Sequence, residues 1–166
     1  MFCPSGIEIA AVPTAGSCPS DVPKSYPSSL IAKIKARGAA AVLDCDGEAL
    51  RIAVNASVKP DLIKPNNEEL AALIGCSPDD PRELAAAAEG LGIPTVITTR
   101  AGDDPLLTDE RGTIFFSQTK RPVVRLKGAG DTFLGAYVYA YYIYGNPPEC
   151  AMEVAVEVAG RYVAGE

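Results

Sequence analysis

The feature that most constrains the fold is the alternation of short apolar runs with stretches of helical periodicity. Residues 39–43 are entirely apolar and end at Asp44, and residues 95–99 are rich in β-branched side chains. A strand that is apolar on both of its faces is typical of a parallel sheet covered by helices on both sides. The sequence therefore predicts a three-layer α/β/α fold with a mostly parallel sheet.

The predicted elements follow one another without a linker, a repeat or a low-complexity segment, which predicts one domain over residues 1–166. The expected strands are 7–12 (closed by Pro13), 39–43, 61–64 and 95–99, and the expected helices are 28–37, 48–54, 66–74, 81–89, 128–144 and 149–163. Residues 106–108 and 113–117 flank a polar four-residue turn, so we expect an antiparallel hairpin at one edge of the sheet.

Composition removes several classes of function. The 21 acidic and 15 basic side chains give a net charge of −6, which disfavours nucleic acid as a partner. The chain has no histidine, so zinc sites built on histidine and Ser-His or Cys-His nucleophiles are excluded. The longest apolar stretch, 133–145, is too short for a membrane helix, and the N-terminus does not resemble a secretory signal. Five scattered cysteines without a Cys-x-x-Cys pair fit a reduced, cytoplasmic protein.

The most informative segment is Gly128-Ala129-Gly130-Asp131, which opens an apolar helix. Free amides at a helix N-terminus, reinforced by the helix dipole, form a site for an anion such as phosphate. A carboxylate in that first turn would repel the anion, but it can accept a proton from a hydroxyl group that attacks phosphorus. Asp131 is therefore a candidate general base, and the alternative is an ordinary helix cap.

Asn66 and Glu69 form a second candidate group, three residues apart, directly after a predicted strand. This spacing predicts a capping box at the start of the helix. It is also compatible with Glu69 holding Mg²⁺ through water beside nucleotide phosphates. Both candidate segments are expected beyond the carboxyl ends of strands, where open α/β sheets bind ligands.

Four segments together resemble the PfkB (ribokinase-like) carbohydrate kinases, in particular the branch with 1-phosphofructokinase and tagatose-6-phosphate kinase. Residues 64–70 (KPNNEEL) and 128–132 (GAGDT) are similar to the two motifs of that family, in the family's order. Residues 16–23 and 42–50 are similar to a Gly-Ser-Leu-Pro loop and a Val-Leu-Asp-Thr-Ser-Gly-Glu-Ala-Leu segment of that branch. The resemblance implies a partial ribokinase-like fold.

The resemblance also implies an activity and a site. The activity is transfer of a phosphoryl group from ATP, with Mg²⁺, to a hydroxyl group of a sugar or sugar phosphate, without nucleic acid or membrane as partner. Asp131 would be the catalytic base and the anion hole would lie at Gly128 to Asp131. By the same resemblance the nucleotide is contacted by Gly128, Ala129, Gly130, Asn66, Thr99 and Gly102, and the metal is held by Glu69.

The chain departs from the family in length and at one turn. Family members are about twice as long, so the chain is similar to the C-terminal half alone, without the N-terminal half that carries most sugar contacts and the lid. Asp103 and Asp104 stand where the family has glycines close to the nucleotide. Three alternatives stay open: a non-catalytic nucleotide-binding fragment, half of a split kinase that needs a complementary chain (or a homo-oligomer), and a poorly folded truncation product.

Two further patterns have ordinary interpretations. Five tyrosines between Tyr137 and Tyr144 are expected to pack in the core and at its rim, with some rings facing a surface left open by the absent half. The basic side chains of Lys120, Arg121, Arg125 and Lys127 are expected on a solvated hairpin edge. Alternatively, Lys127 adds positive charge to a bound phosphate.

Overall fold

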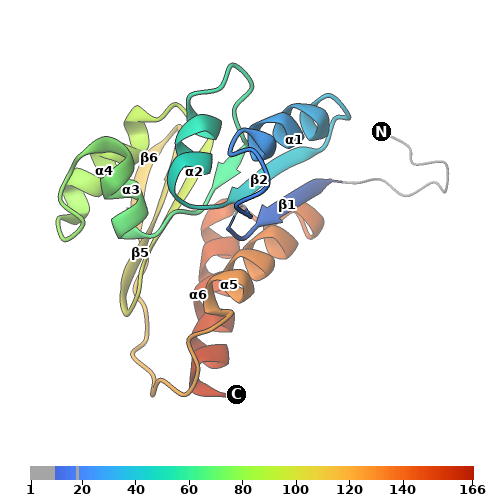
Figure 1. Ribbon diagram of the computed structural model, residues 1–166. Coiled ribbons are helices and arrows are strands. Elements are labelled where there is room, and N and C mark those ends of the chain that lie inside the picture. Colours follow the sequence, from blue (N-terminus) through green and yellow to red (C-terminus); the bar gives the residue numbers. More distant parts are fainter. Residues whose placement is uncertain (1–9, 18) are drawn as a thin grey trace.

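The structure is a computed structural model that describes residues 10–17 and 19–166, and it contains a single six-stranded sheet in the described chain. The strands are adjacent in chain order from β1 to β6, as Figure 1 shows. The first four are parallel: β1 (Ala11–Ala15), β2 (Ala40–Asp44), β3 (Leu62–Ile63) and β4 (Thr95–Arg100). The antiparallel hairpin of β5 (Asp103–Asp109) and β6 (Gly112–Phe115) follows at one edge. The predicted mixed sheet is confirmed.

Helices cover both faces of this sheet, which confirms the three predicted layers. One face packs against α1 (Tyr26–Lys35), α2 (Gly47–Val54), α3 (Asn67–Ile74) and α4 (Pro81–Gly90). The other packs against α5 (Ala129–Val138), its continuation η1 (Tyr139–Ile143) and α6 (Pro148–Ala164). In Figure 1, α5 and α6 lie together on the side of the sheet opposite α1 and α2.

The core explains why the predicted strands are apolar at consecutive positions. Side chains alternate along a strand, so Leu43 and Ile63 point toward the first group of helices. Val42, Leu62 and Ile97 point toward α5 and α6. Both faces of β2, β3 and β4 are therefore buried in hydrocarbon.

Two of the boundaries that differ from the prediction involve proline. Pro13 was expected to end the first strand, but it lies inside β1 and is exposed, because β1 is an edge strand where a missing N–H removes no ladder bond. The predicted residues 7–9 of that strand lie outside the described residues. Helix α1 begins at Tyr26, two residues earlier than expected, with Pro27 in its first turn.

The helix expected from Gly128 to Tyr144 changes its hydrogen-bonding pattern near the end. The α-helical part ends at Val138 and is followed by the π-helical η1. Five-residue spacing brings the rings of Tyr139 and Tyr144 to one side, with centroids 5.2 Å apart. Tyr137 is buried, as expected for a core residue, whereas Tyr139 and Tyr144 are exposed.

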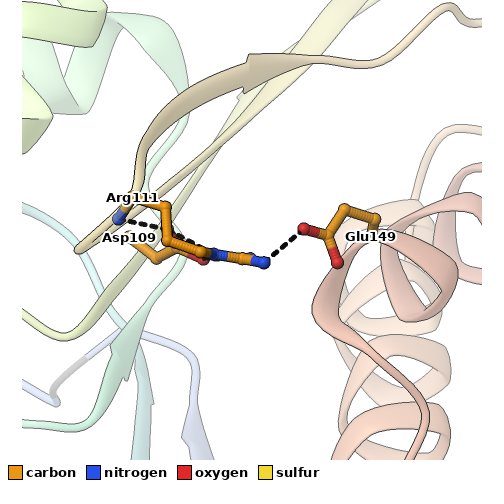
Figure 2. Close-up of polar contacts among 3 residues, drawn as sticks. All are labelled: Asp109, Arg111 and Glu149. Carbon is orange, nitrogen blue, oxygen red and sulfur yellow. Dashed lines mark hydrogen bonds and ion pairs between the residues drawn. The ribbon is translucent and has the colours of Figure 1, made fainter.

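Three charged residues connect the β5–β6 hairpin to helix α6, as Figure 2 shows. Arg111, in the β5–β6 turn, binds Asp109 of the same hairpin and also Glu149 in the first turn of α6, with 2.6 Å between Arg111 Nη1 and Glu149 Oε1. The hydrogen bond from Arg111 lowers the pKa of Asp109, so this carboxylate stays charged. This ion-pair group links the hairpin to the start of α6.

Two members of the basic run, Arg121 and Arg125, contact α6 and do not lie on a hairpin edge, so that interpretation was wrong for them. Arg121 forms ion pairs with Glu157 and Glu166 of the C-terminal region, and Arg125 stacks on Tyr162 of α6.

None of the helices described is long and apolar enough to span a bilayer.

The two-faced core predicts where the fold is sensitive to truncation of a side chain. We expect Leu62→Ala, at a fully buried position of β3, to lower the free energy of unfolding by about 2–5 kcal/mol through lost contacts and a cavity. Val123→Ala, at an exposed position, should change it by less than about 0.5 kcal/mol. Urea unfolding followed by circular dichroism measures both, and equal losses would contradict this account of the core.

Candidate functional site

Three neighbouring strands each carry, at or next to their end, a polar residue whose side chain is on the face of the sheet that packs against α5. Asp44 follows Val42 by two residues on β2, Lys64 follows Leu62 just past β3, and Thr99 follows Ile97 on β4. Because side chains two apart share a face, these three side chains emerge on the α5 side of the sheet, at its carboxyl edge. The start of α5 lies at the same edge, beside Lys64.

Lys64 is the central charge of this edge. Its ammonium group lies 3.0 Å from Asp44 Oδ2, and only 7% of the lysine side chain is exposed. The same ammonium is 3.5 Å from the position that a Cβ on Gly130 would occupy. The positive charge therefore lies directly against the glycine-containing loop that begins α5.

That loop has the geometry of a helix N-terminus open to solvent. Gly128 is the N-cap and has φ +89°, in the left-handed region where a side chain is unfavourable, and its carbonyl accepts from the Thr132 amide at 2.9 Å. The Ala129 amide donates to the Leu126 carbonyl at 3.0 Å. Among the described residues, the amides of Gly130 and Asp131 at the helix start have no backbone partner, and both residues are exposed, so these two amides are available for an anion.

Asn66 and Glu69 form the capping box that their spacing predicts. The Glu69 amide donates to Asn66 Oδ1 at 2.8 Å, and the Asn66 amide donates to Glu69 Oε2 at 2.9 Å. Asn66 also pairs with Thr99 in an isolated parallel bridge. The structure thus brings Asn66, Glu69 and Thr99 next to Lys64.

The site holds several carboxylates around one ammonium group. Burial raises the pKa of Asp44, Lys64 opposes that rise, and the charges of Asp131 and Asp46 add to it. Burial likewise raises the pKa of Glu69, against the hydrogen bond from the Asn66 amide and the charge of Lys64. Asp44 and Glu69 are therefore both close enough to Lys64 to interact with its charge, and Asp131 is close enough to interact with Asp44.

This donor set fits an Mg²⁺ ion that keeps most of its waters. Within residues 10–17 and 19–166, no three carboxylate, cysteine or histidine side chains converge on a point that could hold a metal. Magnesium is commonly held by one or two carboxylates together with substrate phosphates and water. Glu69 Oε1 lies outside the capping hydrogen bond, which uses Oε2.

The turn between β4 and β5 carries the remaining predicted residue. Gly102 faces open space, so the structure does not pack it against the other predicted site residues. Asp103 is exposed and 4.0 Å from the Arg100 guanidinium, and Asp104 accepts a hydrogen bond from the Gln118 amide at 2.9 Å. The two carboxylates therefore point to solvent and to local partners.

Asp44 and Lys64 are site residues to which the sequence analysis gave no role. Both stand within segments that resemble the family, but nothing in the local sequence shows that they form an ion pair. The alternation of side chains along a strand could have identified them. Each is the first charged residue after an apolar run, and each is on the face of the sheet toward α5.

An open α/β sheet with a helix N-terminus at its carboxyl edge is an arrangement found in many proteins that bind phosphate groups or nucleotides. Comparison with known proteins identifies the family. The model of the pfkB family carbohydrate kinases matches residues 8–164, and the chain belongs to this family.

Individual relatives agree with this assignment. The 1-phosphofructokinase of Bacillus subtilis (strain 168) is 33% identical over 127 residues, which cover 75% of this chain and 41% of that protein. Phosphofructokinase-2 from Escherichia coli in complex with fructose-6-phosphate superposes with a TM-score of 0.83 at 24% identity, covering 95% of this chain and 52% of that one. A tetrameric inhibited form of the same enzyme gives 0.82 at 22% identity, covering 93% and 52%. The chain thus spans about half the length of these proteins or less.

The ion pair beneath the loop predicts a pH-dependent stability. We expect Lys64→Met to lower the free energy of unfolding by about 3–5 kcal/mol near neutral pH, because it leaves the Asp44 carboxylate buried without its partner. Without Lys64 the pKa of Asp44 in the folded protein rises further above its unfolded value. The loss should therefore be smallest below about pH 4 and grow as the pH rises, since protonation favours the folded state.

The double variant Asp44→Asn, Lys64→Met is the matched control for this prediction. It removes both charges, so it should recover most of the stability lost near neutral pH. Urea unfolding at several pH values measures all three proteins, and a pH-independent loss in Lys64→Met would contradict the assigned cause.

Proposed function

We propose that this site transfers a phosphoryl group from ATP to a hydroxyl group of a sugar or sugar phosphate. The observation that carries the proposal is the exposed Asp131 in the first turn of α5, beside helix-start amides and the ammonium group of Lys64. A site that only binds phosphate gains nothing from a carboxylate there. A phosphotransferase needs one, because an attacking alcohol must lose its proton.

The residues of the site have complementary roles in this proposal. The amides of Gly130 and Asp131 and the Lys64 ammonium would bind the phosphate oxygens whose charge grows in the transition state. When bound, ATP with Mg²⁺ supplies the phosphoryl group and screens the negative charge of the phosphates. Glu69, held by Asn66, would bind the metal through water, and Thr99, which pairs with Asn66, would contact the nucleotide.

The acceptor is proposed by similarity to the relatives. The Bacillus subtilis relative is a 1-phosphofructokinase, and the Escherichia coli neighbour was solved with fructose-6-phosphate. We therefore expect a phosphorylated ketose, with its attacking hydroxyl placed between Asp131 and the γ-phosphate of ATP. Asp131 would accept the hydroxyl proton as the new P–O bond to the ketose forms, while the bond between the γ-phosphorus and the β–γ bridging oxygen breaks and ADP leaves.

Asp131→Asn tests the role of the base. We expect phosphoryl transfer from ATP to fructose 1-phosphate to fall by about 10²–10⁴-fold, because the amide cannot accept the proton. ATP affinity should persist or increase, since a negative charge beside the phosphates is lost. A coupled ADP-release assay and calorimetry measure the two quantities.

Glu68→Gln is the control for the base, because it removes one exposed carboxylate that neighbours Glu69 outside the capping box. Its turnover should match that of the unchanged protein. If Asp131→Asn kept the activity of the unchanged protein, the assignment of the base would fall.

One surface favours a second form of the proposal, in which turnover requires a complementary polypeptide. Asp131, Gly135, Tyr139 and Ile143 follow one another at four-residue spacing along α5 and η1, and all four are exposed. We call Tyr139, Ile143 and Tyr144 the apolar stripe; these side chains are 56%, 60% and 70% exposed. A chain that covers the stripe would extend along the same helix face toward Asp131. Alone, the chain would then act as a nucleotide-binding module.

The apolar stripe should cause self-association when the complementary chain is absent. We expect the sedimentation coefficient to rise with protein concentration, and the variant Ile143→Ser, Tyr144→Ser to remain monomeric, because less hydrocarbon is available for burial. Val123→Ser changes an equally exposed apolar residue elsewhere and should behave like the unchanged protein. A monomer at all concentrations would count against the stripe as an interaction surface.

A further inference from the structure

We call residues 128–131 the anion loop. Tyr162, near the end of α6, binds the segment that leads into this loop at two points. Its hydroxyl donates a hydrogen bond of 2.8 Å to the Lys127 carbonyl. Its own carbonyl accepts a hydrogen bond of 2.8 Å from Arg125 Nε, and the Arg125 guanidinium lies 4.1 Å from the centroid of the Tyr162 ring. One aromatic residue is thus held by Arg125 and in turn holds the peptide next to Gly128.

The rest of this segment is fixed to the same helix. The amides of Val124 and Arg125 both donate to the Val163 carbonyl, at 2.9 and 3.1 Å. Arg121 pairs with Glu157 of α6 at 2.7 Å. The backbone before the anion loop is therefore positioned by α6 and its side chains, although 35 residues separate Lys127 from Tyr162 in the sequence.

The fit between Tyr162 and the loop is close. A Cβ built on Gly128 would lie 2.8 Å from the Tyr162 hydroxyl oxygen, closer than a side chain tolerates. Gly128 also has a positive φ of 89°. Because residue 128 is a glycine, the backbone can adopt this positive φ, and the Tyr162 hydroxyl can lie close to it.

Tyr162 binds the Lys127 carbonyl, which lies just before the start of α5. In an α-helix, the amide of residue 131 would donate to the carbonyl of residue 127 if the helix started one residue earlier. Here the Tyr162 hydroxyl binds that carbonyl, and α5 starts at Ala129. This arrangement leaves the Asp131 amide for a bound anion.

We propose that Tyr162 is a positioning residue for the anion loop: its hydroxyl holds the Lys127 carbonyl so that the Gly130 and Asp131 amides face a bound polyphosphate. Arg125 supports this role by fixing the ring through stacking and through its hydrogen bond to the Tyr162 carbonyl. The inference rests on the proposed function, because it assumes that the loop binds phosphate groups.

The test is a titration of the 166-residue protein with sodium tripolyphosphate, followed by the backbone amide resonances of Gly130 and Asp131. We expect both resonances to move on binding. Tyr162→Phe keeps the ring and removes the hydrogen bond, so the affinity should fall about fivefold to tenfold, the value of one hydrogen bond of ordinary strength. Arg125→Lys keeps the charge but loses the planar stacking and the forked donor, and it should weaken binding in the same direction.

Tyr144→Phe is the matched control, since this tyrosine is exposed at the far end of the α5–η1 segment. Its affinity for tripolyphosphate should equal that of the unchanged protein. Thermal unfolding of each variant separates a loss of stability from a loss of positioning.

The outcomes distinguish this inference from the function on which it rests. If the unchanged protein shows no movement of the Gly130 and Asp131 resonances, the phosphate-binding function fails, and the role of Tyr162 fails with it. If the unchanged protein responds and both Tyr162→Phe and Arg125→Lys bind with its affinity, the positioning role is overturned and the function stands. A lower melting temperature with unchanged affinity has the same meaning, because Tyr162 would then only stabilise the fold. Should Tyr162→Phe fail to fold, the affinity of Arg125→Lys decides in the same way.

Discussion

The ion pair between Lys64 and Asp44 is the interaction on which the candidate site depends. A lysine buried to this extent needs a carboxylate partner, because an ammonium group loses most of its hydration when it leaves water. The pair joins the carboxyl ends of β2 and β3 and places a positive charge against the loop at Gly130. The small residue in the loop, the nearby carboxylates and the open helix N-terminus are all arranged around this charge.

The fold was largely predictable because strand and helix periods are local properties of the sequence. The consecutive apolar side chains of residues 39–43 predict a strand that is buried on both faces, and the structure shows that burial. The errors arose where a local rule depends on position in the sheet. Pro13 is compatible with a strand because β1 lies at an edge. The π-helical turn after α5 changes the hydrogen-bonding pattern without interrupting the apolar run, so helical periodicity does not reveal it.

The sequence predicted the motifs of the candidate site, but it did not predict the ion pairs and hydrogen bonds between residues that are distant in the sequence. The spacing of Asn66 and Glu69 predicts a capping box, and the structure contains it. The partners of Lys64 and Lys127 are distant in sequence, so their contacts appear only in three dimensions. The basic run was misassigned for the same reason, since the acidic partners of Arg121 are supplied by α6 and the chain end. Function at Asp131 stays a proposal, while membership of the pfkB family follows from the whole chain.

The two layers of helices also have a consequence for how the protein is made. The sheet grows strand by strand in chain order, and residues 26–90 cover its first face. The second face is covered by α5, η1 and α6, which are the last helices of the chain. During synthesis on the ribosome, Val42, Leu62 and Ile97 are therefore made before residues 129–164, which cover them in the folded protein. Apolar surface that is exposed in this way during folding is prone to aggregation and is the kind of surface that chaperones recognise.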